Sequence, residues 1–297
     1  MEYLRRFDVL VKHAEEQGIG LIPSLFWYIC TMPDLQGEPL SALGDPDSKC
    51  RAFMRQYIRD MVGRYKDSPA IWGWEVGNEW MLFVDLPGLA HLPPKKIGSK
   101  EARTAADKLL RPMILDTYKD FYKTIREIDP DRIIVTGDSI ARPSAWHNRN
   151  DDAWGQDTRE QWAEVYRADT PDCYEAASFH LYAQAEQGYF KNKDLAIEDF
   201  VTEVVGISRS DNKIIWCGEL GMPGADEAAR EMFSRMMHAV EQNEIALSAI
   251  WNFKPTGSFQ ADWDISPSNE RAYMLDAVKA LNERFAINAR NLLFHPR

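Results

Sequence analysis

The sequence predicts an α/β protein in which parallel strands and crossover helices form a (β/α) barrel. Apolar segments typical of buried strands alternate with amphipathic segments of helical period along the whole chain. Polar residues follow the strands where each one ends, which is the edge where barrels of this type build their sites. No low-complexity run or Gly/Ser linker divides the 297 residues, so we expect a single domain over residues 1–297.

The first half of the chain predicts three helices that alternate with three strands. Leu4, Phe7 and Ala14 recur at helical spacing, and Gly18 ends the first helix. Pro23 counts against a central position for the first strand, because proline has no N–H to donate to a neighbour. The predicted segments are helix 3–17, strand 20–26, helix 47–65, strand 70–77, an irregular stretch over 81–105, helix 106–128 and strand 132–136.

The second half continues the alternation after a loop from 137 to about 158. Its predicted helices are 159–168, 194–207, 225–242 and 269–284, and its predicted strands are 174–180, 213–219 and 246–252. The chain therefore has about six strands, whereas a closed TIM-type barrel has eight. We expect an incomplete barrel with about six of the eight strand–helix units.

Composition excludes several classes of function. A formal net charge of −11 argues against a nucleic-acid partner, which needs a basic surface. No apolar run is long enough to cross a membrane. The histidines lack metal-ligand spacing and no Gly-rich phosphate loop occurs, so neither a metal nor a cofactor is expected. Residues 2–6 are predicted to be helical and do not resemble a signal peptide, so the default localisation is cytoplasmic. A secreted protein is the alternative if an earlier segment carried a signal peptide.

Two glutamates stand in matching contexts far apart in the sequence. Glu79 closes the strand Ile71–Gly77 after Asn78, and Glu219 closes the strand that begins at Lys213. A carboxylate at the C-terminal end of a buried strand is costly unless a site uses it. Paired carboxylates from two strands suit hydrolysis of a glycosidic bond, with one acting as acid/base and the other as nucleophile. For either glutamate alone, a salt bridge at a strand end is the competing explanation.

Other side chains at the strand ends suit the recognition of a sugar. Asn78 can donate to a sugar hydroxyl, and Tyr182 can hydrogen-bond the nucleophile while His180 contacts the sugar or the acid. Trp251 can offer its indole face to a pyranose ring, and Trp27 and Trp80 are further candidates for stacking. A lone histidine or tryptophan is more often structural, so these assignments depend on the glutamates.

At four places the chain resembles the clan A glycoside hydrolases, and it is most similar to family 5, the cellulase and β-mannanase family. The matched pieces are Trp74-Glu-Val-Gly-Asn-Glu79, Phe179-His-Leu-Tyr182, Gly218-Glu-Leu-Gly221 and Ile250-Trp-Asn252. The resemblance implies that Glu79 is the acid/base and Glu219 the nucleophile of a retaining β-glycosidase. The expected substrate is a β-1,4-linked glucan or mannan, as polysaccharide or oligosaccharide.

The resemblance also implies that the first β-α-β segment of the family barrel is missing, so the chain is N-terminally truncated relative to the family. The arginine that the family brings to the nucleophile has no match, and Ser24-Leu-Phe-Trp27 replaces a usual polar strand end. Strands 20–26 and 246–252 would then be open edges. We expect a second copy of the chain, or an unusual docking of the terminal segments, to cover the gap. A catalytically weak or inactive carbohydrate-binding protein on a degenerate barrel is the alternative function, and an interaction protein that uses the open edges is a third.

Overall fold

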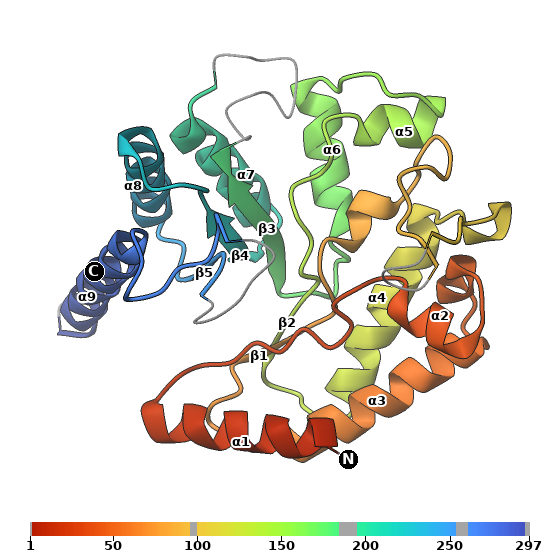
Figure 1. Ribbon diagram of the computed structural model, residues 1–297, viewed down its shortest axis with the longest axis horizontal. Helices are drawn as coiled ribbons and strands as arrows, with labels where there is room; N and C mark the ends of the chain where they lie inside the picture. The colour runs from red at the N-terminus through yellow and green to blue at the C-terminus, as the bar shows by residue number, and fades with distance from the viewer. Residues whose placement is uncertain (1, 96–99, 184–194, 254–260, 295–297) are drawn as a thin grey trace. The chain divides into compact units, whose positions relative to one another are not determined.

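The computed structural model describes residues 2–95, 100–183, 195–253 and 261–294, which belong to two compact units (Figure 1). Unit 1 is Met1–Ser178 and unit 2 is Phe179–Arg297. Unit 1 contains α1 (Glu2–Gln17), α2 (Thr31–Gln36), α3 (Lys49–Tyr65), β1 (Gly73–Glu75), α4 (Arg111–Arg126), β2 (Ile133–Val135), α5 (Ala145–Asp151) and α6 (Arg159–Asp169), with 3-10 turns η1 (Leu40–Gly44), η2 (Trp80–Phe83) and η3 (Ala105–Asp107). Unit 2 contains most of β3 (Ala176–Tyr182), then α7 (Ile197–Ser210), β4 (Ile214–Gly221), α8 (Glu227–Gln242), β5 (Leu247–Ile250) and α9 (Ala272–Phe294).

The strands of unit 1 pair in parallel. β1 and β2 are in register from Gly73 opposite Ile133 to Glu75 opposite Val135. The ladder continues past the end of β1, since Val76 N–H donates to the carbonyl of Val135 at 3.1 Å. The predicted strand 70–77 is therefore present with a shorter regular core.

The prediction of a regular strand over 20–26 is wrong. Leu21 and Ser24 form only isolated parallel bridges, to Ile71 and Glu75 of the neighbouring chain segment. The carbonyl of Pro23 accepts a hydrogen bond from Glu75 N–H at 3.0 Å, but the proline ring has no N–H to continue the ladder. The segment thus runs beside β1 without forming a continuous ladder.

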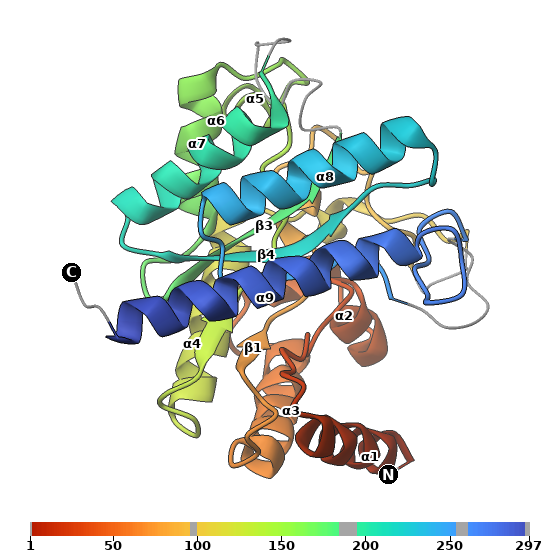
Figure 2. The same ribbon diagram turned by 90° about the vertical axis from the view of Figure 1, so that its left-hand side faces the viewer.

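Unit 2 is built on a three-stranded sheet with strand order β3-β4-β5. β4 and β5 are parallel, with Trp216 opposite Leu247 and Cys217 opposite Ser248, and their register then shifts before Leu220. Helices α8 and α9 lie side by side in this unit (Figure 2). The alternation of parallel strands and helices confirms the predicted α/β class.

Several helix boundaries depart from the prediction. The structure has α2 and α5 in stretches expected to be loops, because short helices give little periodic signal. The helix expected from 106 begins at Arg111, after a turn in which the side chains of Thr104 and Asp107 form a capping box. The expected start of helix 194–207 at residue 194 lies outside the described residues, and α7 begins at Ile197.

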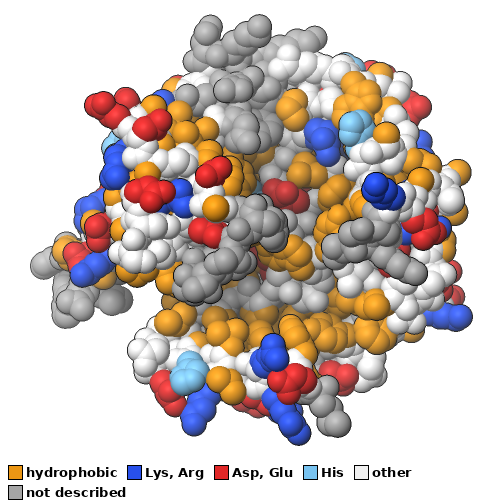
Figure 3. Space-filling model, in the orientation of Figure 1, with side chains coloured by type: hydrophobic (Ala, Val, Ile, Leu, Met, Phe, Trp, Pro, Cys, Tyr) orange, Lys and Arg blue, Asp and Glu red, His pale blue; other side chains and the backbone are white. Residues whose placement is uncertain are grey.

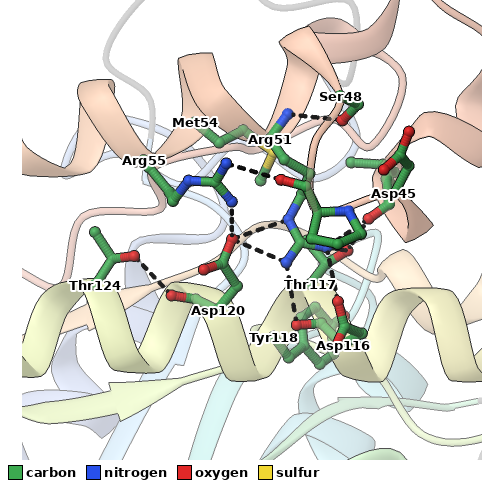
Figure 4. Close-up of polar contacts among 12 residues, drawn as sticks. Asp45, Ser48, Arg51, Met54, Arg55, Asp116, Thr117, Tyr118, Asp120 and Thr124 are labelled. Atoms are coloured by element: carbon green, nitrogen blue, oxygen red, sulfur yellow. Dashed lines mark hydrogen bonds and ion pairs between the residues drawn. The ribbon is translucent and has the colours of Figure 1, made fainter.

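A buried arginine joins α3 to α4 in unit 1 (Figure 4). Arg51 is 2% exposed and forms ion pairs with Asp116 at 3.1 Å and Asp120 at 2.8 Å. It also donates to the carbonyl of Leu43 at 2.7 Å and to the hydroxyl of Thr117 at 3.2 Å. These partners give a buried charge the compensation it needs, so the two helices are fixed against each other and against η1.

The outer surface of α1 is charged, as its amphipathic sequence predicts. Arg6 pairs with Glu2 and Lys12 with Glu16, both one helical turn apart. Figure 3 shows red and blue side chains on the outer side of this helix, at the bottom of the view, and orange hydrophobic side chains on its other side. Among the described residues, no helix combines the length and apolar character needed to cross a membrane.

Candidate active site

Glu79 occupies a turn that follows β1 in unit 1. Its backbone has a left-handed conformation with φ of 54°, and its N–H donates to the carbonyl of Gly137 at 3.0 Å. Its carbonyl accepts a hydrogen bond from Leu82 N–H at 3.1 Å, which closes the η2 turn. A left-handed conformation is uncommon for a residue with a side chain and is often found at functional sites. The turn therefore directs a half-buried carboxylate away from the line of the strand.

Asp138 and Arg142, which both follow β2 in the sequence, hold the η2 turn in place. Asp138 accepts a hydrogen bond from Met81 N–H at 3.0 Å through Oδ1 and one from the hydroxyl of Tyr118 at 2.8 Å through Oδ2. Burial raises the pKa of Tyr118 well above its usual value, so the phenol remains a donor. The guanidinium of Arg142 donates to the carbonyl of Leu82.

Arg142 also brings a positive charge to the neighbourhood of Glu79. Burial lowers the pKa of the Arg142 guanidinium, and the negative charge of Glu79 opposes this shift. The guanidinium carbon lies 5.9 Å from the centre of the Trp154 ring. The sequence analysis did not select Arg142, because an arginine in a long loop carries no periodic or motif signal.

A glycine is required at position 137 beside Glu79. Gly137 has φ of 75°, and a Cβ added there would lie 1.9 Å from the carbonyl oxygen of Gly77 and 2.7 Å from the side chain of Glu75. The carbonyl of Gly137 accepts the N–H of Glu79, so this close approach of the two backbone segments fixes the position of Glu79.

The other predicted site residues of unit 1 differ in their exposure. Asn78 is half-buried, and its N–H donates to the carbonyl of Trp27 at 2.9 Å. Trp27 is 46% exposed, whereas Trp80 is 1% exposed and donates its indole N–H to the carbonyl of Phe26 at 3.1 Å. Trp27 therefore has exposed ring surface next to Asn78, while Trp80 serves the packing of unit 1.

Glu219 lies in unit 2 where β4 changes register against β5. The shift falls between Cys217 and Leu220, so Gly218 and Glu219 occupy the irregular positions. Such irregularities re-aim side chains at the ends of strands. A Cβ added to Gly218 would lie 2.9 Å from Nε2 of His180, so the glycine leaves the room that the histidine ring occupies.

Tyr182 and His180 both contact the carboxylate of Glu219. The hydroxyl of Tyr182 donates to Oε2 of Glu219, and Nδ1 of His180 lies 3.4 Å from the same oxygen. His180 is 2% exposed and Glu219 is 8% exposed. A hydrogen bond donated to a carboxylate favours its ionised form, which is the form a nucleophile needs.

Two tryptophans border this cluster. The N–H of Trp251 donates to the carbonyl of Leu220 at 2.8 Å, immediately beyond Glu219, and the Trp251–Asn252 peptide bond is cis. The ring of Trp263 meets the ring of Tyr182 edge to face, with centroids 5.4 Å apart. The sequence analysis did not select Trp263, because nothing in its local pattern indicates contact with Tyr182.

The chain matches one family model over most of its length. Residues 2–257 match the model described as Cellulase (glycosyl hydrolase family 5). Among curated proteins, the chain is 32% identical over 141 residues to the probable mannan endo-1,4-β-mannosidase C of Aspergillus terreus. It is 34% identical over 84 residues to the mannan endo-1,4-β-mannosidase F of Aspergillus clavatus.

These sequence matches cover only part of each protein. They span 45% and 26% of this chain, and 32% and 19% of the length of the two Aspergillus proteins. The chain thus spans less than two thirds of the curated relatives it matches.

Solved structures share the fold at low sequence identity. The endo-1,4-β-mannanase of Rhizomucor miehei superposes with a TM-score of 0.67 at 19% identity, covering 94% of this chain and 76% of that one. The endoglucanase Cel5A of Pseudomonas stutzeri, solved with cellobiose, gives 0.59 at 18% identity, covering 95% and 73%. Together with the parallel strands, the family match indicates the (β/α)8 barrel type of fold.

Proposed function

The chain belongs to glycosyl hydrolase family 5, the cellulase family, and on that premise we propose that it is a retaining glycoside hydrolase acting on β-1,4-linked glucan or mannan chains. The observation that carries the proposal is the Glu219 carboxylate in unit 2, which accepts a hydrogen bond from Tyr182 beside His180. A buried carboxylate held in this way suits attack on an anomeric carbon.

Glu219 is the proposed nucleophile and Glu79 the proposed acid/base. Glu79 protonates the leaving oxygen while Glu219 forms a covalent glycosyl-enzyme, and Glu79 then deprotonates the water that releases the sugar. This mechanism requires carboxyl groups about 5–5.5 Å apart, so we propose that the two glutamates meet at one sugar-sized opening. Asn78, His180, Tyr182, Trp251 and Trp27 are the proposed substrate contacts.

Mannan is the first substrate to test. Both Aspergillus relatives are described as mannan endo-1,4-β-mannosidases, and the Rhizomucor structure is an endo-1,4-β-mannanase. Glucan is the second, because the Pseudomonas structure is an endoglucanase bound to cellobiose. Release of reducing sugar from mannan and from soluble cellulose measures the preference directly.

Glu219→Gln tests the proposed nucleophile. The change keeps the size of the side chain and removes its charge, so turnover of an activated aryl β-glycoside should be abolished while the fold is retained. Glu231→Gln, an exposed carboxylate on α8, is the matched control and should leave turnover unchanged. Equal rates for Glu219→Gln and the unmodified chain would remove the proposal.

A carbohydrate-binding protein without turnover is the second candidate. It is favoured by the apolar Leu25 and Phe26 that precede Trp27, at a strand end that is usually polar in the family. This function predicts that manno-oligosaccharides bind in calorimetry while no reducing sugar is released, so the two assays together separate the candidates.

We also propose that the chain has about six of the eight barrel units and that a second copy covers the open edges. The described residues contain five strands and the bridged segment 20–26, and the chain covers 76% of the Rhizomucor mannanase. Beside that segment, Ile19 is 54% and Trp72 is 51% exposed. Light scattering tests the assembly, and a monomer at all concentrations would contradict coverage by a second copy.

A further inference from the structure

A groove of about 640 Å³ in unit 1 lies between α4 and the segment that connects α6 to β3. Figure 1 labels α4, α6 and β3. The α4 side contributes Lys119 and Lys123, and the other side contributes Arg167, Asp172 and Cys173. Nothing in the proposed hydrolytic mechanism uses this groove.

Ion pairs hold the groove at both ends. Near the start of α4, Arg111 pairs with Asp169 at 2.9 Å, and near its end Arg126 pairs with Glu175 at 2.7 Å. Between them, the hydroxyl of Tyr174 donates to the backbone carbonyl of Tyr118 at 2.7 Å. The walls are therefore fixed to each other, and the groove is a built feature of unit 1.

The acids around the groove already have partners. Asp169 pairs with Arg111 and Glu175 with Arg126, as above, and Asp116 and Asp120 of α4 pair with Arg51. Within the described part of the chain, neither Lys119 nor Lys123 forms an ion pair. They stand one helical turn apart, where like charges repel.

The lining carries more positive than negative charge. Lys119, Lys123 and Arg167 face a single acid, Asp172, although the chain as a whole has a formal net charge of −11. Tyr122, Leu115 and Pro171 add apolar surface to the same lining. Because Lys119 and Lys123 form no ion pair among the described residues, the groove favours a ligand that combines about two negative charges with a small organic body.

We propose that this groove binds a phosphate monoester, with the phosphate between Lys119, Lys123 and Arg167 and the organic part against Tyr122. A phosphate monoester carries about −1.5 to −2 charges at pH 7, which offsets the excess positive charge of the lining. Lysines are effective phosphate ligands as point charges, and arginine adds a planar fork of donors. Binding at this site is independent of glycoside hydrolysis.

Calorimetry on the full chain with glucose 6-phosphate tests the proposal, with inorganic phosphate, glucose and succinate in parallel. Glucose 6-phosphate should bind with a dissociation constant of about 1 mM or tighter, and glucose at the same concentrations should not bind at this site. Equal affinity of inorganic phosphate would show that the organic part makes no contact with Tyr122 and would overturn the assignment to a monoester. Succinate binding as tightly as the phosphate ester would overturn the assignment to phosphate.

The double variant Lys119→Gln/Lys123→Gln should weaken binding of the ester at least tenfold. The matched control is Lys12→Gln/Lys66→Gln, which removes the same charge from exposed positions outside the groove. The proposal would be overturned if the ester did not bind, or if the groove variant bound it as tightly as the unmodified chain. It would also be overturned if the groove variant and the control variant lost the same affinity for the ester. Thermal unfolding checks that both variants are folded.

The reaction rate of the Cys173 thiol provides a second test of the positive potential in the groove, and this test needs no bound ligand. Cys173 is exposed, whereas Cys30, Cys50 and Cys217 are buried, so it is the first thiol that a reagent reaches. A positive groove should accelerate its reaction with an anionic aromatic disulfide relative to a neutral one, and phosphate should slow the anionic reaction. A rate ratio unchanged by the two groove substitutions would contradict the predicted positive potential.

Discussion

The hydroxyl of Tyr182 donates a hydrogen bond to the carboxylate of Glu219, joining the end of β3 to the end of β4 within unit 2. His180 lies 3.4 Å from the same carboxylate oxygen, and Gly218 leaves space for its ring. A hydrogen bond donated by a phenol to a carboxylate favours the ionised form of that carboxylate.

Tyr182→Phe removes this donor and keeps the ring that Trp263 contacts. A hydrogen bond to a charged group contributes about 1.5–3 kcal/mol, so kcat/KM for an aryl β-glycoside should fall about ten- to a hundredfold. Tyr3→Phe, at a position 58% exposed, is the control and should not change the rate. A Tyr182→Phe enzyme with full activity would show that the hydrogen bond has no catalytic role.

Gly137→Ala should displace the turn that carries Glu79. The added Cβ would meet the carbonyl oxygen of Gly77 at 1.9 Å in a conformation with φ of 75°, so we expect a loss of more than about 2 kcal/mol in the free energy of unfolding. Gly63→Ala in α3 meets nothing within 4 Å and should stabilise by about 0.5–1 kcal/mol. Urea denaturation measures both, and similar effects for the two variants would refute the close approach at Gly137.

Arg51→Gln should destabilise the contact between α3 and α4. The change removes the buried cation that Asp116 and Asp120 share, together with its hydrogen bonds to Leu43 and Thr117, whereas Asp120 keeps Arg55 as a partner. We expect a cost of about 2 kcal/mol in the free energy of unfolding. Arg59 pairs with Glu127 at 3.9 Å on the surface, so Arg59→Gln should cost less than about 0.5 kcal/mol. If both variants cost the same, the network of Figure 4 does not contribute to stability as described.

Stability should decrease with rising pH through the titration of Asp169. Burial raises its pKa to about 7 although Arg111 opposes the shift, whereas the unfolded chain releases this proton near pH 4. Between these values the folded chain binds more protons, so this group's contribution to the free energy of unfolding falls from about pH 4 to pH 7 and then becomes constant. Asp169→Asn should remove this part of the pH dependence. Parallel pH curves for the two chains would exclude the raised pKa.

Much of the architecture could be predicted from local patterns. Strands such as 213–219 and helices such as 225–242 carry strong periodicity, and the structure places β4 and α8 within a few residues of them. Segment 20–26 was predicted as a strand because its residues are apolar, but the missing N–H of Pro23 leaves only isolated bridges. Helix α5 is too short for periodicity to reveal.

The residues of the candidate site that lie at strand ends could be predicted from the sequence. Residues that reach the site from loops distant in the sequence could not. His180, Tyr182 and Glu219 follow from their positions at strand ends, and the structure brings these three together in unit 2. Trp263 contacts Tyr182 from a loop 81 residues later, and no local pattern encodes such a contact. Trp80 has the composition of a stacking residue, yet its indole N–H is used by the backbone of unit 1.

Trapping the covalent intermediate tests the central claim most directly. An activated 2-deoxy-2-fluoro-β-mannoside or -glucoside slows the second step of a retaining mechanism, and peptide mass spectrometry then locates the bound sugar. The proposal predicts one sugar per chain, esterified to Glu219, and no label on Glu219→Gln. Turnover of the parent substrates without a label, or a label on a carboxylate other than Glu219, would contradict it.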